Sequence, residues 1–188
     1  MVASRPAILE RESDDALMAR VAQRDAAAFR ILIDGHCARP HRIAYRMLGD
    51  ASEAEDVAQE VMLRLWNGAD KWQAGGAGVS AWLSRVATNL CLDRLRRRKF
   101  VSDEAVPERA DSAAGADEMI DEERLRARTV AAVQALPDRQ RAAIILTYYE
   151  GHSNIMGAQA LDMNIKAFES LLLRARSALR ATLGGEAS

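Results

Sequence analysis

Apolar residues recur every three or four positions along most of the chain, which is the spacing of amphipathic helices. Three regions interrupt this pattern: the turn before Pro40, a glycine-rich stretch at 67–78 and an acidic stretch at 101–116. The pattern predicts helices over 13–35, 40–48, 52–66, 80–99, 117–136, 138–150, 153–161 and 165–183.

Residues with known preferences for helix ends refine these boundaries. Ser13 is a plausible N-cap of the first helical stretch, and Pro40 fits the start of the second. Gly49 is expected to end that second helix. Ser52 with Glu55 has the spacing of a capping box for the third helix.

The two longer interruptions divide the chain into domains. Four glycines make 67–78 a predicted loop, and 101–116 has so little to bury that it is predicted to be a flexible linker. Low proline and glycine contents with abundant alanine, leucine and arginine favour helices throughout. We therefore expect an all-α protein of two small helical domains, 13–100 with four helices and 117–184, joined by the linker.

The net charge of −1 hides a strong segregation of charge. Residues 50–60 hold five acids and no base, 79–100 hold six bases and one acid, and 101–123 hold nine acids and one base. Such blocks are typical of separate surfaces for different partners, although solvated helix faces are the simpler alternative.

Several classes of protein are disfavoured. The longest apolar runs are a few residues, so no membrane insertion is predicted, and residues 1–10 lack the apolar stretch of a signal peptide. Cys37 and Cys91 suit free thiols in a reducing compartment, so a cytoplasmic location is expected.

No constellation for catalysis stands out. His36, Cys37 and His41 lie close in sequence but match no common zinc spacing. The glycines at 75–78 lack the flanking residues of a nucleotide-binding loop. We predict no enzyme, no catalytic residue, no metal site and no cofactor.

The third predicted helix carries an acidic face. Asp56, Gln59, Glu60 and Leu63 are spaced i, i+3, i+4 and i+7, so they share one side of the helix. An apolar residue among acids and an amide is typical of a surface that docks a basic helix. The alternative is that the acids only complement the helix dipole.

The fourth predicted helix carries groups suited to nucleic acid. Trp82, Arg85, Asn89 and Arg96 lie on one side, and Arg97 and Arg98 extend the basic path. An indole can stack on an unpaired base, an amide can bond a base edge and guanidinium groups can hold phosphates. The alternative places Trp82 in the core and the arginines in solvent.

The last two helices have the outline of a helix-turn-helix. A turn at 162–164 joins a short helix to a longer basic one, whose first residues can enter a major groove. The candidate contacts on the second helix are Lys166, Glu169, Ser170, Arg174 and Arg176.

These segments resemble a known family. DASEAEDVAQEVMLRLW (50–66) resembles region 2.2 of bacterial sigma factors, and WLSRVATNLCLDRLRRR (82–98) resembles regions 2.3–2.4. LPDRQR (136–141), EGHS (150–153) and LLRARSALR (172–180) together resemble region 4. With only regions 2 and 4 present, the layout resembles the extracytoplasmic-function (ECF) group of the sigma-70 family.

The resemblance implies a role and partners. It implies an alternative sigma factor that binds core RNA polymerase, at the β′ coiled coil and the β flap, and initiates transcription of a stress- or signal-responsive regulon. The acidic face would contact polymerase. Trp82, Arg85, Asn89 and the arginines at 96–98, with the glycine-rich loop, would capture an extruded −10 base, and the last helix would read the −35 element. An anti-sigma factor is a further implied partner.

Four positions depart from the family pattern. Asp162 stands where glycine is frequent, Gly157 replaces a larger residue, and Glu169 and Leu171 stand where basic residues are common. Glu169 can accept a hydrogen bond from cytosine but not from guanine, so we expect a cytosine opposite it in the −35 element. Otherwise Glu169 points to solvent or pairs with Lys166.

Two other functions remain open at this point. One is a helix-turn-helix regulator that binds duplex DNA without polymerase, which leaves the acidic face unexplained. The other is a sigma-like mimic that titrates an anti-sigma factor, which leaves the basic run at 94–99 unnecessary.

Overall fold

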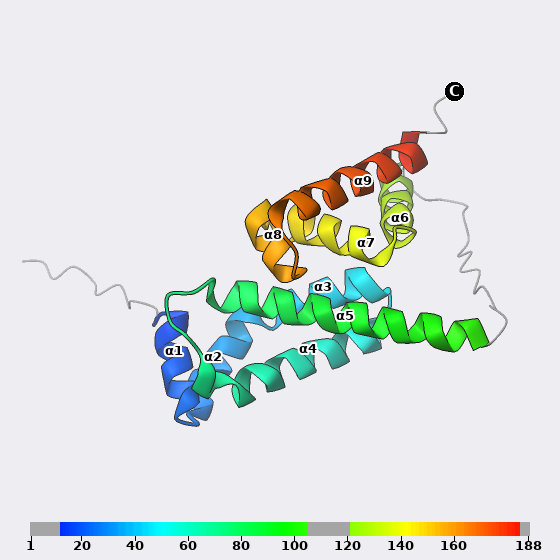
Figure 1. The fold of residues 1–188 in the computed structure, drawn as a ribbon. Coiled ribbons are helices and arrows are strands. Elements are labelled where there is room, and N and C mark those ends of the chain that lie inside the picture. Colours follow the sequence, from blue (N-terminus) through cyan, green and yellow to red (C-terminus); the bar gives the residue numbers. More distant parts are fainter. Residues whose placement is uncertain (1–11, 105–120, 185–188) are drawn as a thin grey trace, which may run out of the picture.

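The computed structural model describes residues 12–104 and 121–184 (Figure 1). All the regular elements in these two ranges are helical. They are α1 (Asp14–Ala22), α2 (Ala26–His36), α3 (Ala38–Leu48), α4 (Ala51–Asn67), η1 (Ala69–Lys71), α5 (Gly78–Glu104), α6 (Asp121–Gln134), α7 (Asp138–Ile144), η2 (Ile145–Tyr149), α8 (Asn154–Ala160) and α9 (Ile165–Gly184). We call α1–α5 the N-terminal unit and α6–α9 the C-terminal unit.

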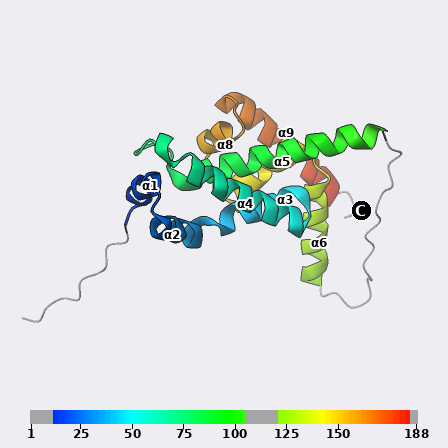
Figure 2. The same ribbon diagram turned by 90° about the horizontal axis from the view of Figure 1, so that it is seen from below.

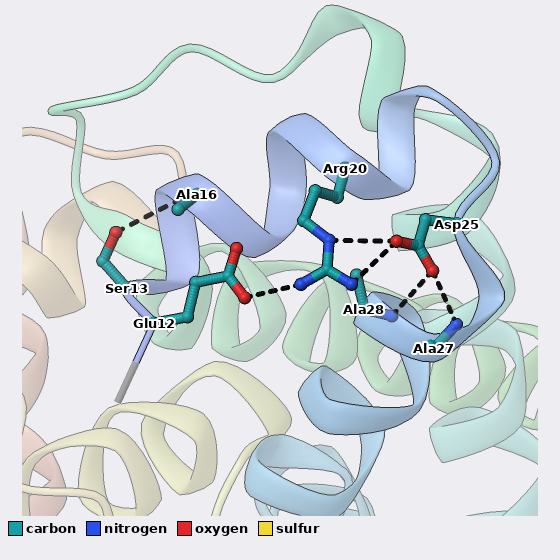
Figure 3. A network of polar contacts seen from close by, with 7 residues as sticks. All are labelled: Glu12, Ser13, Ala16, Arg20, Asp25, Ala27 and Ala28. Atoms are coloured by element: carbon teal, nitrogen blue, oxygen red, sulfur yellow. Dashed lines mark hydrogen bonds and ion pairs between the residues drawn. The ribbon is translucent and has the colours of Figure 1, made fainter. Parts of the chain in front are cut away.

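The first predicted helix is two helices, because the chain turns between Ala22 and Ala26. Arg24 adopts a left-handed conformation there (φ 65°), which no continuous helix allows. Asp25 then caps α2, accepting hydrogen bonds from the amides of Ala27 (2.9 Å) and Ala28 (3.2 Å). Arg20 donates to the same carboxylate from Nε (2.9 Å) and Nη2 (2.8 Å), which holds the turn closed (Figure 3).

The other predicted helix ends are partly confirmed. Ser13 caps α1 by accepting from the amide of Ala16, and Gly49 ends α3 in a left-handed conformation (φ 72°). The Ser52–Glu55 capping box is wrong, because α4 begins two residues earlier. Asp50, in extended conformation, accepts from the amide of Glu53 at 2.8 Å and is the N-cap.

The N-terminal unit packs α3, α4 and α5 side by side, with α1 and α2 at one end (Figures 1 and 2). Fully buried aliphatic side chains fill the space between these three helices, each worth about 1.5–3 kcal/mol when taken out of water. They include Ile43, Met47, Val57, Val61, Leu65 and Leu83.

Two predicted irregular stretches are partly helical. Residues 69–71 of the predicted loop form the 3-10 turn η1, and α5 continues to Glu104, past the predicted linker start at 101. The rest of the predicted linker, 105–116, lies outside the described residues, as does the start of the predicted second domain at 117.

The C-terminal unit is built around Phe168 of α9, which is fully buried. A Cβ at Gly157 of α8 would lie 2.3 Å from Cζ of that ring, so only glycine fits there. Leu171 is also buried against this core, so this position does not face solvent. Packing therefore accounts for two of the departures, at Gly157 and Leu171.

The two units are in direct contact: α8 lies on α5, while η2 and α7 lie on α3 (Figure 1). The buried guanidinium of Arg141 in α7 donates to the carbonyl of Met47 at 2.6 Å, and the Gln134 amide donates to the carbonyl of Arg46 at 2.6 Å. Side chains of α6 and α7 therefore satisfy carbonyls that the end of α3 leaves unpaired.

The helices in the described ranges do not combine the length and hydropathy needed to cross a bilayer. The described residues also bring together no group of three or more potential metal ligands. His36 instead faces Asp14, with 3.0 Å between its Nε2 and the carboxylate.

Candidate nucleic-acid interface

The first half of α5 presents Trp82, Arg85 and Asn89 on successive turns of one side. Trp82 is half-buried and packs against the core, while Arg85 is exposed. Trp82 and Arg85 also line a cavity of about 660 Å³ beside the loop at 72–78. The alternative of a core Trp82 is therefore partly right, because one indole serves both the core and the cavity.

This cavity, which we call the tryptophan pocket, is walled by a second indole. Its lining also includes Trp72 and glycines of the loop, together with Met156, Gln159 and Ala160 of α8. Two aromatic faces, a guanidinium and an amide are groups that stack on a base and bond its edges.

Asp15 of α1 holds the loop that borders the pocket. Its carboxylate accepts a hydrogen bond from Nε1 of Trp72 at 2.8 Å and one from the amide of Gly75 at 3.0 Å. These two bonds lower the pKa of Asp15 below its ordinary value, the bond from Trp72 contributing most. Sequence reasoning missed Asp15 and Trp72, although a tryptophan in a glycine-rich polar stretch is a signal that something must pack against it.

The arginines near the C-terminal end of α5 differ in how far they are already engaged in ion pairs. Arg98 pairs with Glu53 of α4 at 2.6 Å and donates to the carbonyl of Leu48, so it ties α5 to its neighbours. Arg96 pairs with Asp93 one turn back, at 2.9 Å. Arg97 is exposed and has no such ion pair within the described residues. All three predicted phosphate contacts are exposed, and within the described residues Arg97 is the one that forms no ion pair.

The four predicted polymerase contacts lie together on the outer face of α4. Leu63 is 59% exposed, although the helix buries Val57, Val61 and Leu65 on its inner face. Glu60 pairs with Arg64 at 2.6 Å, and Asp56 lies 4.0 Å from Arg94 of α5. The surface is therefore an exposed leucine flanked by Asp56, Gln59 and Glu60.

Helices α8 and α9 and the turn between them form the predicted helix-turn-helix. Ser153 caps α8, accepting from the amide of Met156 at 3.3 Å, and Asn164 caps α9, accepting from the amide of Ala167 at 2.8 Å. Every predicted contact on α9 is exposed: Lys166, Glu169, Ser170, Arg174 and Arg176.

Glu169 is exposed, as one arm of the predicted alternative has it, and its described partner is Asn154 instead of Lys166. Its Oε1 accepts a hydrogen bond from Nδ2 of Asn154, the first residue of α8, at 3.3 Å. Because this bond uses one carboxylate oxygen, the other remains able to accept from a base.

The candidate residues on α5 and on the helix-turn-helix meet each other. Nη2 of Arg85 donates to one carboxylate oxygen of Asp162, and Nδ2 of Asn89 lies 3.5 Å from the other. Asp162 has a left-handed backbone (φ 49°) in the turn between α8 and α9. The sequence analysis did not predict this contact, which joins residues more than 70 positions apart.

Comparison with known proteins identifies both units. Residues 32–101 match Sigma-70 region 2, and residues 126–179 match Sigma-70 region 4. The ECF RNA polymerase sigma factor SigK of Mycolicibacterium vanbaalenii is 32% identical over 177 residues, which cover 90% of this chain and 89% of that relative. SigW of Bacillus subtilis is 29% identical, covering 87% of this chain and 93% of SigW. SigE of Mycolicibacterium smegmatis is 34% identical over 84% of this chain and 62% of SigE.

Solved structures share the fold. CnrH in complex with the cytosolic domain of CnrY has a TM-score of 0.70 at 24% identity, covering 94% of this chain and all of CnrH. RpoE in complex with the anti-sigma factor NepR from Bartonella quintana has a TM-score of 0.66 at 22% identity, covering 84% of this chain and 98% of RpoE. With both regions matched in order and relatives aligned along most of their length, this chain belongs to the sigma-70 family, in its ECF group of RNA polymerase sigma factors.

Proposed function

We propose that this chain binds core RNA polymerase and directs it to promoters by reading a −10 element with α5 and a −35 element with α9. One observation carries the proposal: a pocket lined by two tryptophans and an exposed helix-turn-helix occur in one chain of this family. In this role the polymerase performs the chemistry, and the chain supplies specificity in the cytoplasm without a cofactor.

The acidic face of α4 is the proposed polymerase contact. Leu63 supplies apolar area at its centre, and Asp56 and Glu60 supply negative charge that steers a basic helix into register. The β′ coiled coil is the expected partner of this face, and the β flap that of the C-terminal unit.

The tryptophan pocket is the proposed receptor for a −10 base. Extruding a base from the duplex costs a few kcal/mol, and stacking on an aromatic side chain returns about 1–3 kcal/mol. Asn89 can bond a base edge, while Arg85 and Arg97 can hold the backbone on either side.

Helix α9 is the proposed reader of the −35 element. Lys166, Glu169 and Ser170 lie in its first turns, where recognition helices contact base edges. Arg174 and Arg176 lie further along, where phosphate contacts position a helix in the groove.

Charge reversal on α4 tests the polymerase contact. Asp56→Arg with Glu60→Arg should weaken core binding at least tenfold by replacing attraction with repulsion. The control is Asp34→Arg with Glu123→Arg, which makes the same charge change at exposed positions of α2 and α6. Affinity is measured with fluorescent chain and purified core, and helicity by circular dichroism. Undiminished core binding by a normally helical α4 variant would rule out this surface.

Core affinity, measured together with DNA binding and transcription, separates the two other functions. A helix-turn-helix regulator would bind duplex DNA and show no affinity for core. A mimic would bind an anti-sigma factor and fail to support transcription. We expect an anti-sigma partner in addition to core, because RpoE was solved with the anti-sigma factor NepR and CnrH with the cytosolic domain of CnrY.

A further inference from the structure

The contact between Asp162 and α5 joins the two proposed DNA-reading surfaces. Arg85 and Asn89 are the proposed −10 contacts, and Asp162 lies in the turn of the helix-turn-helix. A carboxylate that receives a guanidinium and an amide offers the same groups as a phosphate or a base edge. In this arrangement Asp162 occupies side chains that DNA would need.

Asp162 occupies a turn position where the family pattern has glycine. Its φ of 49° lies in the left-handed region, where glycine is the least strained residue. Glycine at this position would keep the turn but lose the carboxylate. The departure from the family pattern therefore coincides with the contact to α5.

The same packing makes α8 part of the tryptophan pocket. Met156, Gln159 and Ala160 of α8 line this cavity together with Trp72 and Trp82. Separation of α8 from α5 would therefore change the walls of the pocket.

A second contact, between Glu150 and α3, also holds the units together. The Glu150 side chain is 1% exposed and lies between three arginines of α3, which are Arg42 (3.3 Å), Arg39 (3.5 Å) and Arg46 (4.0 Å). Arg46 also covers the ring of Tyr149, 4.6 Å from its centre. This contact leaves the DNA-reading residues untouched and only fixes the units relative to each other.

While its two units are in contact, the chain cannot bind the −10 and −35 elements at the same time. Elements centred at −10 and −35 lie about 25 base pairs apart, which is ~85 Å of B-form DNA. Because α5 and α8 touch, the two reading surfaces are far closer than that. The units must separate before both elements are bound.

We propose that Asp162 is an autoinhibitory latch, whose carboxylate occupies Arg85 and Asn89 in the free chain and masks the −10 surface until polymerase separates the units. This inference rests on the proposed function. It predicts that the free chain binds single-stranded DNA more weakly than a variant in which the contact of Asp162 with Arg85 and Asn89 is broken.

The latch is tested with Asp162→Asn, because asparagine tolerates the left-handed backbone but cannot pair with Arg85. The probe is a fluorescein-labelled 12-nucleotide DNA strand of mixed sequence, and affinity for the free chain is measured by anisotropy. We expect binding to tighten about 2- to 5-fold, the range for breaking one exposed ion pair. Asp34→Asn, the same change at an exposed site on α2, controls for lost negative charge and should tighten binding less.

Two more variants keep the test decisive. In Arg85→Ala with Asp162→Asn the gain should disappear, because the freed guanidinium is its cause. Glu150→Gln should tighten DNA binding and increase the radius of gyration in solution scattering. Equal DNA affinity of Asp162→Asn and wild type would overturn the latch, and so would an equal gain in Asp34→Asn.

Failure of the latch is distinguishable from failure of the proposed function. If wild-type chain with core initiates at promoters while Asp162→Asn binds DNA as wild type does, only the latch is wrong. If Asp162→Asn gains affinity but wild type with core initiates nowhere, the masking stands and the promoter role is wrong.

Discussion

The buried ring of Phe168 requires that residue 157 be glycine. The missing Cβ of Gly157 leaves the space that the Phe168 ring fills, and Phe168 is the largest fully buried side chain in the described residues. From the sequence alone, Gly157 was only a departure from the family pattern. Its reason lies eleven positions further along, in a contact that periodicity does not reveal.

We expect Gly157→Ala to destabilise the C-terminal unit by about 1–3 kcal/mol, because the added methyl group would overlap a ring that cannot move away. Gly35→Ala is the matched control. Its Cβ would meet nothing within 4 Å, so it should stabilise α2 by ~0.5–1 kcal/mol. Urea unfolding followed by circular dichroism measures both, and a Gly157→Ala protein as stable as wild type would contradict the packing described.

His152 should make stability depend on pH. It is 4% exposed, both ring nitrogens lack hydrogen-bond partners within the described residues, and Arg39 of α3 lies nearby. Burial lowers its pKa below the ordinary 6.5, and the charge of Arg39 lowers the pKa further, against the opposing effect of Glu150. As the pH is lowered, the unfolded chain therefore takes up this proton before the folded chain does. The contribution of neutral His152 to the free energy of unfolding is fully present above pH 6.5 and is lost as the pH falls below that value.

Thermal unfolding between pH 7.5 and 5.5 measures this dependence. The unfolding temperature of wild type should fall with pH more steeply than that of His152→Gln, which has no proton to take up there. Parallel curves for wild type and His152→Gln would show that His152 does not contribute.

At the scale of elements, the sequence predicted where helices lie better than how they end. The periodic stretches at 52–66, 80–99 and 165–183 correspond to α4, α5 and α9. The break at Arg24 was missed because the apolar spacing continues across it, and only the bonds from Arg20 to Asp25 mark the turn. The α4 cap was misassigned because Asp50 and Ser52 are equally good caps, and extended backbone at Asp50 decides between them.

The sequence predicted which candidate site residues are exposed, but not which residues they pair with. An amphipathic pattern separates the inner face of α4 from Leu63, so that surface was predictable. Pairing was not predictable, since Glu53 and Arg98 lie 45 positions apart and only the packing of α4 on α5 joins them.

Helix α9 carries a prediction about sequence readout. Asn154 holds one oxygen of Glu169, which leaves the other free to accept from the N4 amino group of a cytosine. Glu169→Gln should relax the preference at one −35 position by ~1–3 kcal/mol, and promoter selection with both proteins measures it. Glu123→Gln on α6 is the control, and identical preferences for wild type and Glu169→Gln would mean that Glu169 reads nothing.

In the whole molecule, the net charge of −1 is the sum of acidic and basic regions that lie on different helices. The acids of α4 and the bases of α5 lie on adjacent helices and are partly paired, Glu53 with Arg98 and Asp56 with Arg94. The contact between the units was not predictable from those regions. It depends on single pairs, such as Arg141 with the carbonyl of Met47, that become visible only when α3 and α7 are placed together.

Reconstituted transcription tests whether this chain directs core RNA polymerase to promoters. The chain is added to the core RNA polymerase of its source bacterium on fragments of that genome, and the 5′ ends of the transcripts are mapped. We predict new start sites that share two sequence motifs centred about 25 base pairs apart, ~85 Å along the duplex. Asn89→Ala should blur the motif nearer the start. Start sites that are the same with and without the chain would contradict the account.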